Sequence, residues 1–128
     1  MRLLLDTHAL LWFIVDDAKL SPKARAAIAD PRNERLLSPI CLLEIALKAR
    51  LGKLSLSRLF GAMFPTQLTL NRIALLPIEV SHLEPLTLMP MIHRDPFDRL
   101  LASTAVVEGV VLVSADATFD SYGVNRLW

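Results

Sequence analysis

The chain has 128 residues, 53% of them hydrophobic and 21% charged, which excludes a disordered protein and matches the length of one domain. A net charge of +1 gives no overall basic surface for nucleic acid, and a single cysteine excludes an internal disulfide or a cysteine-rich zinc site. No apolar stretch reaches the roughly 20 residues of a membrane-spanning helix. The carboxylate of Asp6 comes too early for the apolar region of a signal peptide. We therefore expect one soluble, cytoplasmic domain over residues 1–128.

Short apolar runs separated by helix signals predict that strands and helices alternate along the chain. The expected elements are, in chain order, a strand at 2–6, helices at 7–15 and 21–30, a strand at 35–37, helices at 38–51 and 57–71, a strand at 74–77, a short helix from 81, a helix at 97–108, and strands at 110–113 and 124–128. Such alternation predicts an α/β fold with a central, mostly parallel sheet flanked by helices. Strands that are apolar throughout agree with a sheet covered on both faces.

Local signals set the expected helix boundaries. Ser21 and Ser38 each precede a proline, and Asp95 precedes Pro96, so all three are expected N-caps. The Ser-x-x-Glu spacing from Ser81 predicts a capping box at the start of a short helix. Pro65 is expected to kink or break the helical stretch at 57–71.

Four acids stand in apolar surroundings, where a carboxylate is costly unless something compensates its charge. They are Asp6 and Asp116, which follow apolar strands, Glu44, which lies inside an apolar helix, and Asp98, which opens the helix at 97–108. Ligand sites of parallel sheets gather at the carboxyl ends of the strands, so we expect these acids to converge. Together they predict a site for Mg²⁺ or Mn²⁺, which prefer carboxylate oxygens.

Each acid also has a simpler explanation. Asp6 and Asp116 are suited to capping the helices that follow them, and Asp98 to a favourable interaction with its helix dipole. Glu44 is placed to pair with Lys48 four residues later. The residues 45–78 contain no acid and five basic side chains, which either attract the backbone of a nucleic acid or form a solvated helix face.

Four segments resemble the motifs of PIN domains, specifically the VapC ribonuclease toxins of type II toxin–antitoxin systems. They are, in family order, residues 6–12 (DTHALLW), 38–48 (SPICLLEIALK), 93–101 (HRDPFDRLL) and 114–119 (SADATF). The resemblance implies a PIN-like three-layer fold and an endoribonuclease that uses Mg²⁺ or Mn²⁺. It also implies an RNA substrate, a homodimer, and a cognate antitoxin protein whose tail enters the acidic groove.

Carried over by position, Asp6, Glu44, Asp98 and Asp116 match the family's catalytic acids and metal ligands. Thr7 and Ser114 match neighbouring polar positions that orient the acids. Cys41 departs from the family, which commonly has Ser or Thr there, and a thiol is a weaker hydrogen-bond donor.

Three nearby residues are interpreted without a catalytic role. His93 is read as a loop or packing residue, Arg99 as the partner of an acid, and Asp120 as a surface residue. Two other functions stay open: a catalytically weak PIN fold that binds a partner, and a phosphoacceptor or phosphatase α/β domain.

An apolar stripe predicts a contact surface. Phe60, Met63 and Phe64 fall at i, i+3 and i+4 in the helical stretch at 57–71. Trp12, Phe13 and the apolar residues of 57–71 are candidates for a homodimer contact, and the antitoxin helix is expected in a groove that includes this stretch. The alternative is that the stripe is internal core.

Overall fold

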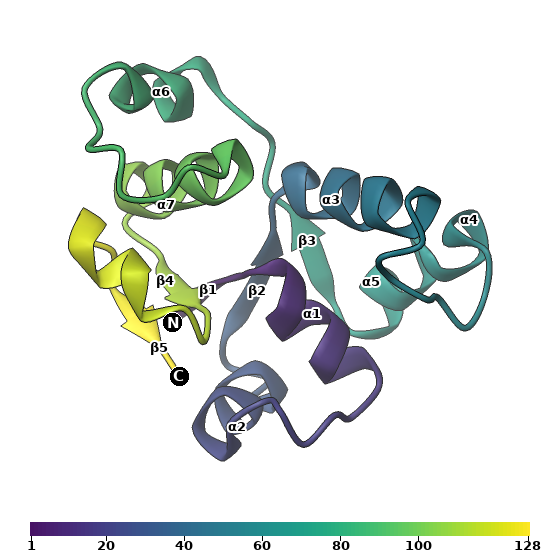
Figure 1. Cartoon of the computed structure of the whole chain (residues 1–128). Helices are drawn as coiled ribbons and strands as arrows, with labels where there is room; N and C mark the ends of the chain where they lie inside the picture. The colour runs from purple at the N-terminus through teal and green to yellow at the C-terminus, as the bar shows by residue number, and fades with distance from the viewer.

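The computed structural model describes all residues, 1–128, and is built on a five-stranded parallel sheet (Figure 1). The strands are β1 (Arg2–Leu5), β2 (Glu34–Leu37), β3 (Ile73–Leu75), β4 (Val111–Val113) and β5 (Arg126–Leu127). Their order is β3-β2-β1-β4-β5, and every neighbouring pair is parallel. The predicted α/β architecture is confirmed, with β1 at the centre of the sheet.

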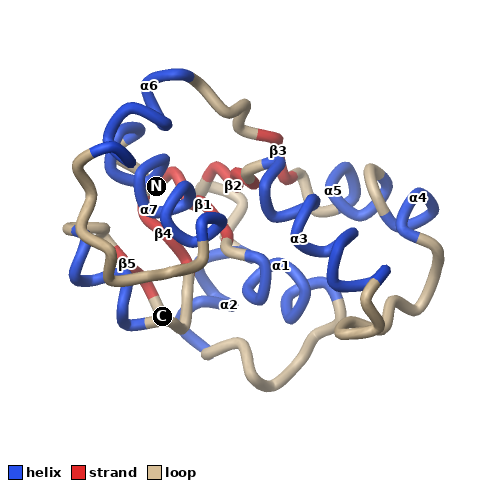
Figure 2. Tube along the Cα trace, turned by 45° about the horizontal axis from the view of Figure 1, so that its top comes forward, coloured by secondary structure: helices blue, strands red, loops and turns tan.

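Seven α-helices and two 3₁₀ helices surround the sheet, as Figure 2 shows. The α-helices are α1 (Thr7–Ile14), α2 (Pro22–Ala29), α3 (Pro39–Arg50), α4 (Phe60–Met63), α5 (Thr66–Leu70), α6 (Val80–Leu83) and α7 (Pro96–Glu108). The 3₁₀ helices are η1 (Glu84–Thr87) and η2 (Ala117–Tyr122). None of these helices has the length and hydropathy that crossing a bilayer requires.

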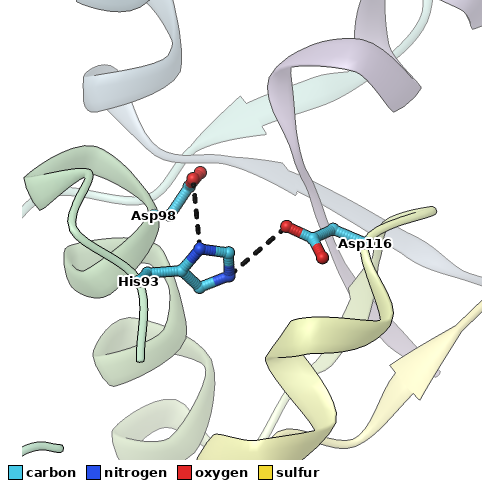
Figure 3. A group of neighbouring side chains, drawn as sticks. All are labelled: His93, Asp98 and Asp116. Carbon is cyan, nitrogen blue, oxygen red and sulfur yellow. Dashed lines mark ion pairs between the residues drawn. The ribbon is translucent and has the colours of Figure 1, made fainter. Parts of the chain in front are cut away.

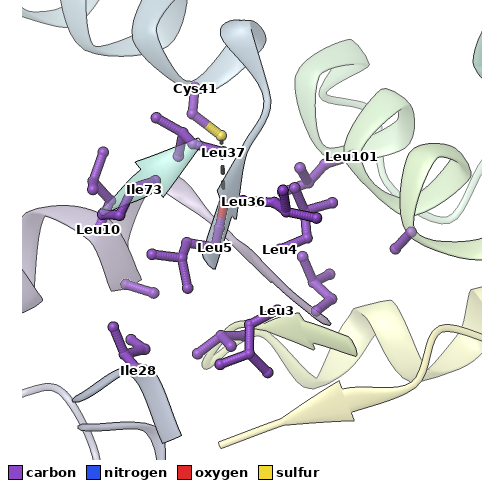
Figure 4. Packing of buried hydrophobic residues seen from close by; sticks show 14 of the residues in the cluster. Leu3, Leu4, Leu5, Leu10, Ile28, Leu36, Leu37, Cys41, Ile73 and Leu101 are labelled. Atoms are coloured by element: carbon purple, nitrogen blue, oxygen red, sulfur yellow. Dashed lines mark hydrogen bonds between the residues drawn. The ribbon is translucent and has the colours of Figure 1, made fainter. Parts of the chain in front are cut away.

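The core is one cluster of 25 buried residues, and it contains all three leucines of β1 (Figure 4). Leu3, Leu4 and Leu5 have no exposed surface. Successive side chains of a strand point to opposite faces, so both faces of β1 are covered. This double coverage explains why the strand is apolar throughout instead of alternating.

The predicted N-caps of three helices are confirmed by their side-chain hydrogen bonds. The side chains of Ser21 and Ser38 accept from the backbone N–H groups of residues 24 and 40. Asp95 accepts from the N–H of Phe97 at 2.8 Å, and Pro96 occupies the first turn of α7. Gly109 ends α7 with a φ of 63°, a left-handed conformation that glycine adopts at little cost.

The predicted capping box from Ser81 is wrong. The N-cap of α6 is Glu79, whose carboxylate accepts from the N–H of His82, and whose own N–H donates to His82 Nδ1 at 3.0 Å. The His82 ring is fully buried, and its Nε2 lies 2.6 Å from Glu108 Oε1 on α7. This contact with a residue distant in the chain holds the His82 ring in place. The residue spacing around Ser81 does not predict it.

Pro65 breaks the helical stretch into α4 and α5, as predicted. Met63 and Phe64 are 7% and 5% exposed and belong to the core. Phe60 packs beside Phe64, with ring centroids 5.1 Å apart. Met63 and Phe64 are therefore internal core, the second of the two roles considered for the stripe, while Phe60 is only partly buried.

Candidate active site

The four predicted carboxylates line one pocket of about 140 Å³. Asp6 comes directly after β1, and Asp116 lies three residues beyond the end of β4. Glu44 projects from α3, which follows β2, and Asp98 lies in the first turn of α7. The topology thus brings together residues that are more than 100 positions apart, at the carboxyl edge of the sheet.

Asp6 caps α1 from within the pocket. Its Oδ1 accepts from the N–H of Ala9 at 2.7 Å, so its predicted capping role is real. Burial raises the pKa of this carboxyl above its usual value, while hydrogen bonds from Ser114 and Ala9 act in the opposite direction. The charged form of Asp6 is therefore held in place but poorly solvated, a state that a bound cation would relieve.

Glu44 has two compensating partners. Its Oε1 lies 3.0 Å from Lys48 Nζ, the ion pair predicted from the spacing along α3. Its Oε2 accepts from the Thr7 hydroxyl at 3.3 Å. Pairing with Lys48 and a place in the acidic cluster are alternative explanations of Glu44 from the sequence. In the structure both apply.

Asp98 is the most perturbed acid of the pocket. Burial, then the neighbouring charge of Asp95, raises its pKa to about 6, and Glu44 and Asp116 add to this. His93 opposes the rise, with Nδ1 lying 3.8 Å from Asp98 Oδ2. No lysine or arginine forms an ion pair with Asp98, in contrast to Glu44.

Asp116 is the most exposed of the four, at 43% of its side chain. Its Oδ1 accepts from the N–H of Thr118 at 2.9 Å and so caps η2, which is the simpler role considered for it. The hydroxyl of Ser114 accepts from the N–H of Asp116 at 3.1 Å. Ser114 therefore orients this turn, in agreement with the role that its position implies.

His93 lies between Asp98 and Asp116, as Figure 3 shows. Its Nε2 is 3.3 Å from Asp116 Oδ2. The interpretation of His93 as a packing residue alone is therefore incomplete. Its ring does pack, with centroids 5.0 Å from Phe119 and 5.8 Å from Tyr122. The available signal was its position just before the Asp95-Pro96 helix start, on the loop that enters the site.

Comparison with known proteins agrees with this geometry. A family model for the PIN domain matches residues 3–125. The chain belongs to the PIN domain family. The PIN-like fold expected from the four motifs is thus confirmed.

Two solved structures share the fold of this PIN domain. One is VapBC2 from Rickettsia felis bound to a DNA fragment from its promoter, with 16% identity, a TM-score of 0.73, and coverage of 99% of this chain and 98% of the other. The second is VapBC-1 from nontypeable Haemophilus influenzae, with 16% identity, a TM-score of 0.63, and coverage of 99% and 97%. A search of curated proteins found no significant match.

The pocket of this PIN domain has the donor chemistry of a divalent-cation site. His93, Asp98 and Asp116 each offer a ligand atom, and these atoms lie within 4.8 Å of one another. His93 Nε2 is buried and has no hydrogen-bond partner of acceptable geometry, although Asp116 is near. Crowded carboxylates beside an unpartnered ring nitrogen fit a cation well.

Cys41, where the PIN family commonly has a hydroxyl, faces the end of β1. Its Sγ lies 3.8 Å from the carbonyl oxygen of Leu5. Burial raises the pKa of the thiol to about 12, so the thiol stays neutral. A neutral group that contacts the backbone disturbs the charges of the pocket little.

Arg99 does not pair with an acid, so that prediction is wrong. Its guanidinium is buried and donates to three backbone carbonyl oxygens, those of Leu86, Met89 and Pro90. The loop that leads to His93 wraps over this part of α7, and its carbonyl groups take the place of a carboxylate. Asp120 is a surface residue as predicted, and pairs with Arg126 at 2.9 Å.

The basic residues of the 45–78 segment differ in their position relative to the acidic pocket of this PIN domain. Lys48 lines the acidic pocket, whereas Arg72 lines a separate hollow together with Arg35 and Phe13. Lys48 is the one basic side chain of the segment that lines the acidic pocket.

Proposed function

We propose that this PIN domain is a metal-dependent endoribonuclease and the toxin component of a type II toxin–antitoxin module. The observation that carries the proposal is the convergence of Asp6, Glu44, Asp98 and Asp116 in one pocket. The similarity to the family's motifs supports RNA as the substrate. The two similar structures, both VapBC complexes, support the toxin assignment.

We assign the four carboxylates as ligands of Mg²⁺ or Mn²⁺. When bound, the cation supplies Lewis-acid activation of water and neutralises charge on the phosphate. The chain's own residues position the acids. The N–H of Ala9 holds Asp6, and Thr7 holds Glu44. Lys48, half-exposed beside Glu44, adds a positive charge at the rim that attracts the RNA backbone.

We propose a cognate antitoxin protein and a second copy of the chain as partners, in the cytoplasm. Several large apolar side chains of the chain are exposed, in contrast to the buried Met63 and Phe64. Leu59, Val80 and Leu88 are each more than 80% exposed. Apolar side chains left outside the core in this way support protein contacts. Leu59 belongs to the 57–71 stretch already expected to form the contact surface, and Val80 and Leu88 extend the candidates beyond it.

Cleavage of a labelled single-stranded RNA by the purified, antitoxin-free protein tests the proposal. We expect internal cuts with Mg²⁺ or Mn²⁺, none with excess chelator, and slower cleavage at higher salt. Asp6→Asn keeps an acceptor for the N–H of Ala9. We expect it to reduce the rate at least about 100-fold, because the cation supplies several kcal/mol of charge stabilisation.

Asp120→Asn is the matched control, since it makes the same chemical change outside the pocket. It should cut as fast as the wild type. Cleavage that persists in chelator, or an Asp6→Asn protein with full activity, would reject the nuclease assignment. The partner-binding alternative would then replace it.

A further inference from the structure

We infer that His93 is a direct ligand of the bound cation together with Asp98 and Asp116, and that it makes the site prefer Mn²⁺ to Mg²⁺. The inference deepens the proposed function and rests on it, because it names a nitrogen ligand beside the acids. The motif resemblance supplies only oxygen ligands. The position of His93 between two of the acids adds a nitrogen ligand to this set.

The position of the His93 ring is fixed before any ligand binds. Its backbone N–H donates to the Tyr122 hydroxyl at 2.5 Å, and its ring is stacked on Tyr122 with an interplanar angle of 20°. Phe119 packs against the ring as well, with centroids 5.0 Å apart. Ordering a ligand side chain when an ion binds costs conformational entropy. Packing already orders the His93 ring in the ion-free protein, so little of this cost remains on binding.

Both ring nitrogens face the acids, as Figure 3 shows, with separations of 3.8 Å to Asp98 and 3.3 Å to Asp116. Ligand atoms on opposite sides of an Mg²⁺-sized ion lie roughly 4.2 Å apart, twice the metal–oxygen distance. The three donors lie within 4.8 Å of one another, so small side-chain shifts bring them around one ion. The buried Nε2 has no hydrogen bond to give up when it binds the ion.

The ligand types set the metal preference. Carboxylate oxygens suit Mg²⁺ and Mn²⁺ alike, whereas an imidazole nitrogen favours first-row transition ions. Mg²⁺ also dehydrates reluctantly and tends to keep its waters. One imidazole added to the carboxylate ligands therefore shifts the site toward Mn²⁺.

Binding of manganese chloride and magnesium chloride to the full chain, measured by calorimetry without RNA, tests the inference. We expect the wild type to bind Mn²⁺ more tightly than Mg²⁺. His93→Phe keeps an aromatic ring against Phe119 and Tyr122 and removes both nitrogens. We expect it to lower the Mn²⁺ affinity by more than roughly 10-fold, the smallest loss typical even of residues that only support a metal ligand, and to change the Mg²⁺ affinity much less.

Pulsed electron paramagnetic resonance of bound Mn²⁺ gives a direct signature. Coupling to an imidazole nitrogen should appear in the wild type and vanish in His93→Phe. His8→Gln is the matched control, because His8 lines the pocket of the four carboxylates but lies outside the group of three ligands. It should keep the coupling. Circular dichroism establishes that each variant is folded, and His93→Gln replaces His93→Phe if the latter is not.

Several results would overturn the inference. The wild type could show no nitrogen coupling, or the coupling could vanish in His8→Gln. The Mn²⁺ affinity could also stay unchanged in His93→Phe. If His93 only neutralises the acids as an imidazolium, its removal leaves more negative charge and both ions bind more tightly, which also contradicts direct ligation. Intact coupling in a protein that cuts no RNA would reject the nuclease proposal alone.

Discussion

The Thr7 hydroxyl donates a hydrogen bond to the Glu44 carboxylate, 3.3 Å away, and so joins the start of α1 to the middle of α3. Lys48 pairs with the other oxygen of the same carboxylate. Glu44 is therefore compensated within the protein by a lysine, while the only ion-pair partner of Asp98 is His93, 3.8 Å away. The four acids are not equivalent, and burial together with the charge of Asp95 raises the pKa of Asp98 to about 6.

Asp98→Asn should raise the melting temperature of the metal-free protein at about pH 8, where the wild-type carboxylate is charged. The substitution removes repulsion from Asp95, Glu44 and Asp116. We expect a rise of about 3–6 °C, which corresponds to roughly 1 kcal/mol in a domain of this size. RNA cleavage should be lost. Thermal denaturation with chelator present checks the stability, and a variant that melts below the wild type would count against the acidic cluster.

The stability of the metal-free protein should depend on pH through Asp98. Its pKa is raised from 3.8 to about 6 by burial and by the charge of Asp95. Between these values the folded protein keeps a proton that the unfolded chain has released, so the stabilisation present below the unfolded pKa is lost as pH rises through about 6. Urea unfolding across this range should show the advantage of Asp98→Asn growing with pH. An advantage that is largest at the acidic end would contradict the raised pKa.

Mn²⁺ should raise the melting temperature of the wild type, because the ion binds only the folded cluster. Asp98→Asn should show a smaller rise, since it has lost one ligand. Thermal denaturation with and without the ion measures both shifts. The control is Asp120→Asn, which lies outside the pocket and should respond as the wild type does. Equal shifts in all three proteins would mean that the ion binds elsewhere.

Cys41→Ser should leave RNA cleavage equal to or faster than in the wild type. The Sγ atom contacts the Leu5 carbonyl oxygen at 3.8 Å, and a serine hydroxyl at this position is a better donor to the same acceptor. Single-turnover cleavage of a labelled RNA measures the rate. Cys41→Ala, which has no donor, is the comparison. If the serine variant is slower than the alanine variant, the thiol has a role that a hydroxyl does not fill.

Arg99→Lys should destabilise the fold by at least about 2 kcal/mol, because buried carbonyl groups left without a donor cost about 1–3 kcal/mol each. A lysine has one charged nitrogen and does not reproduce the guanidinium's contacts with Leu86, Met89 and Pro90. Urea unfolding measures the change. Arg94→Lys, at an exposed position on the same loop, is the control and should be nearly neutral. Similar losses in both variants would show that the carbonyl contacts of Arg99 contribute little.

Much of this protein follows from short stretches of sequence. The boundaries of α7 are set by Asp95, Pro96 and Gly109, which act on backbone groups within a few residues of themselves. The burial of β1 follows from three consecutive leucines. The convergence of Asp6 and Asp116 follows from parallel topology, because strand ends of a parallel sheet meet at one edge. Hydrophobic pattern and helix capping depend on residues that are close together in the chain. The folded protein therefore keeps the elements that these patterns predict.

Other features were decided only by tertiary structure. Glu79 caps α6 in place of the expected Ser81 because His82 is anchored to Glu108, 26 residues away. Arg99 finds carbonyl groups where an acid was expected, and His93 lies between two acids that are brought together by different elements. In each case the outcome depends on which groups the folded chain brings next to one another. Such contacts join distant positions, so no local pattern of residues encodes them.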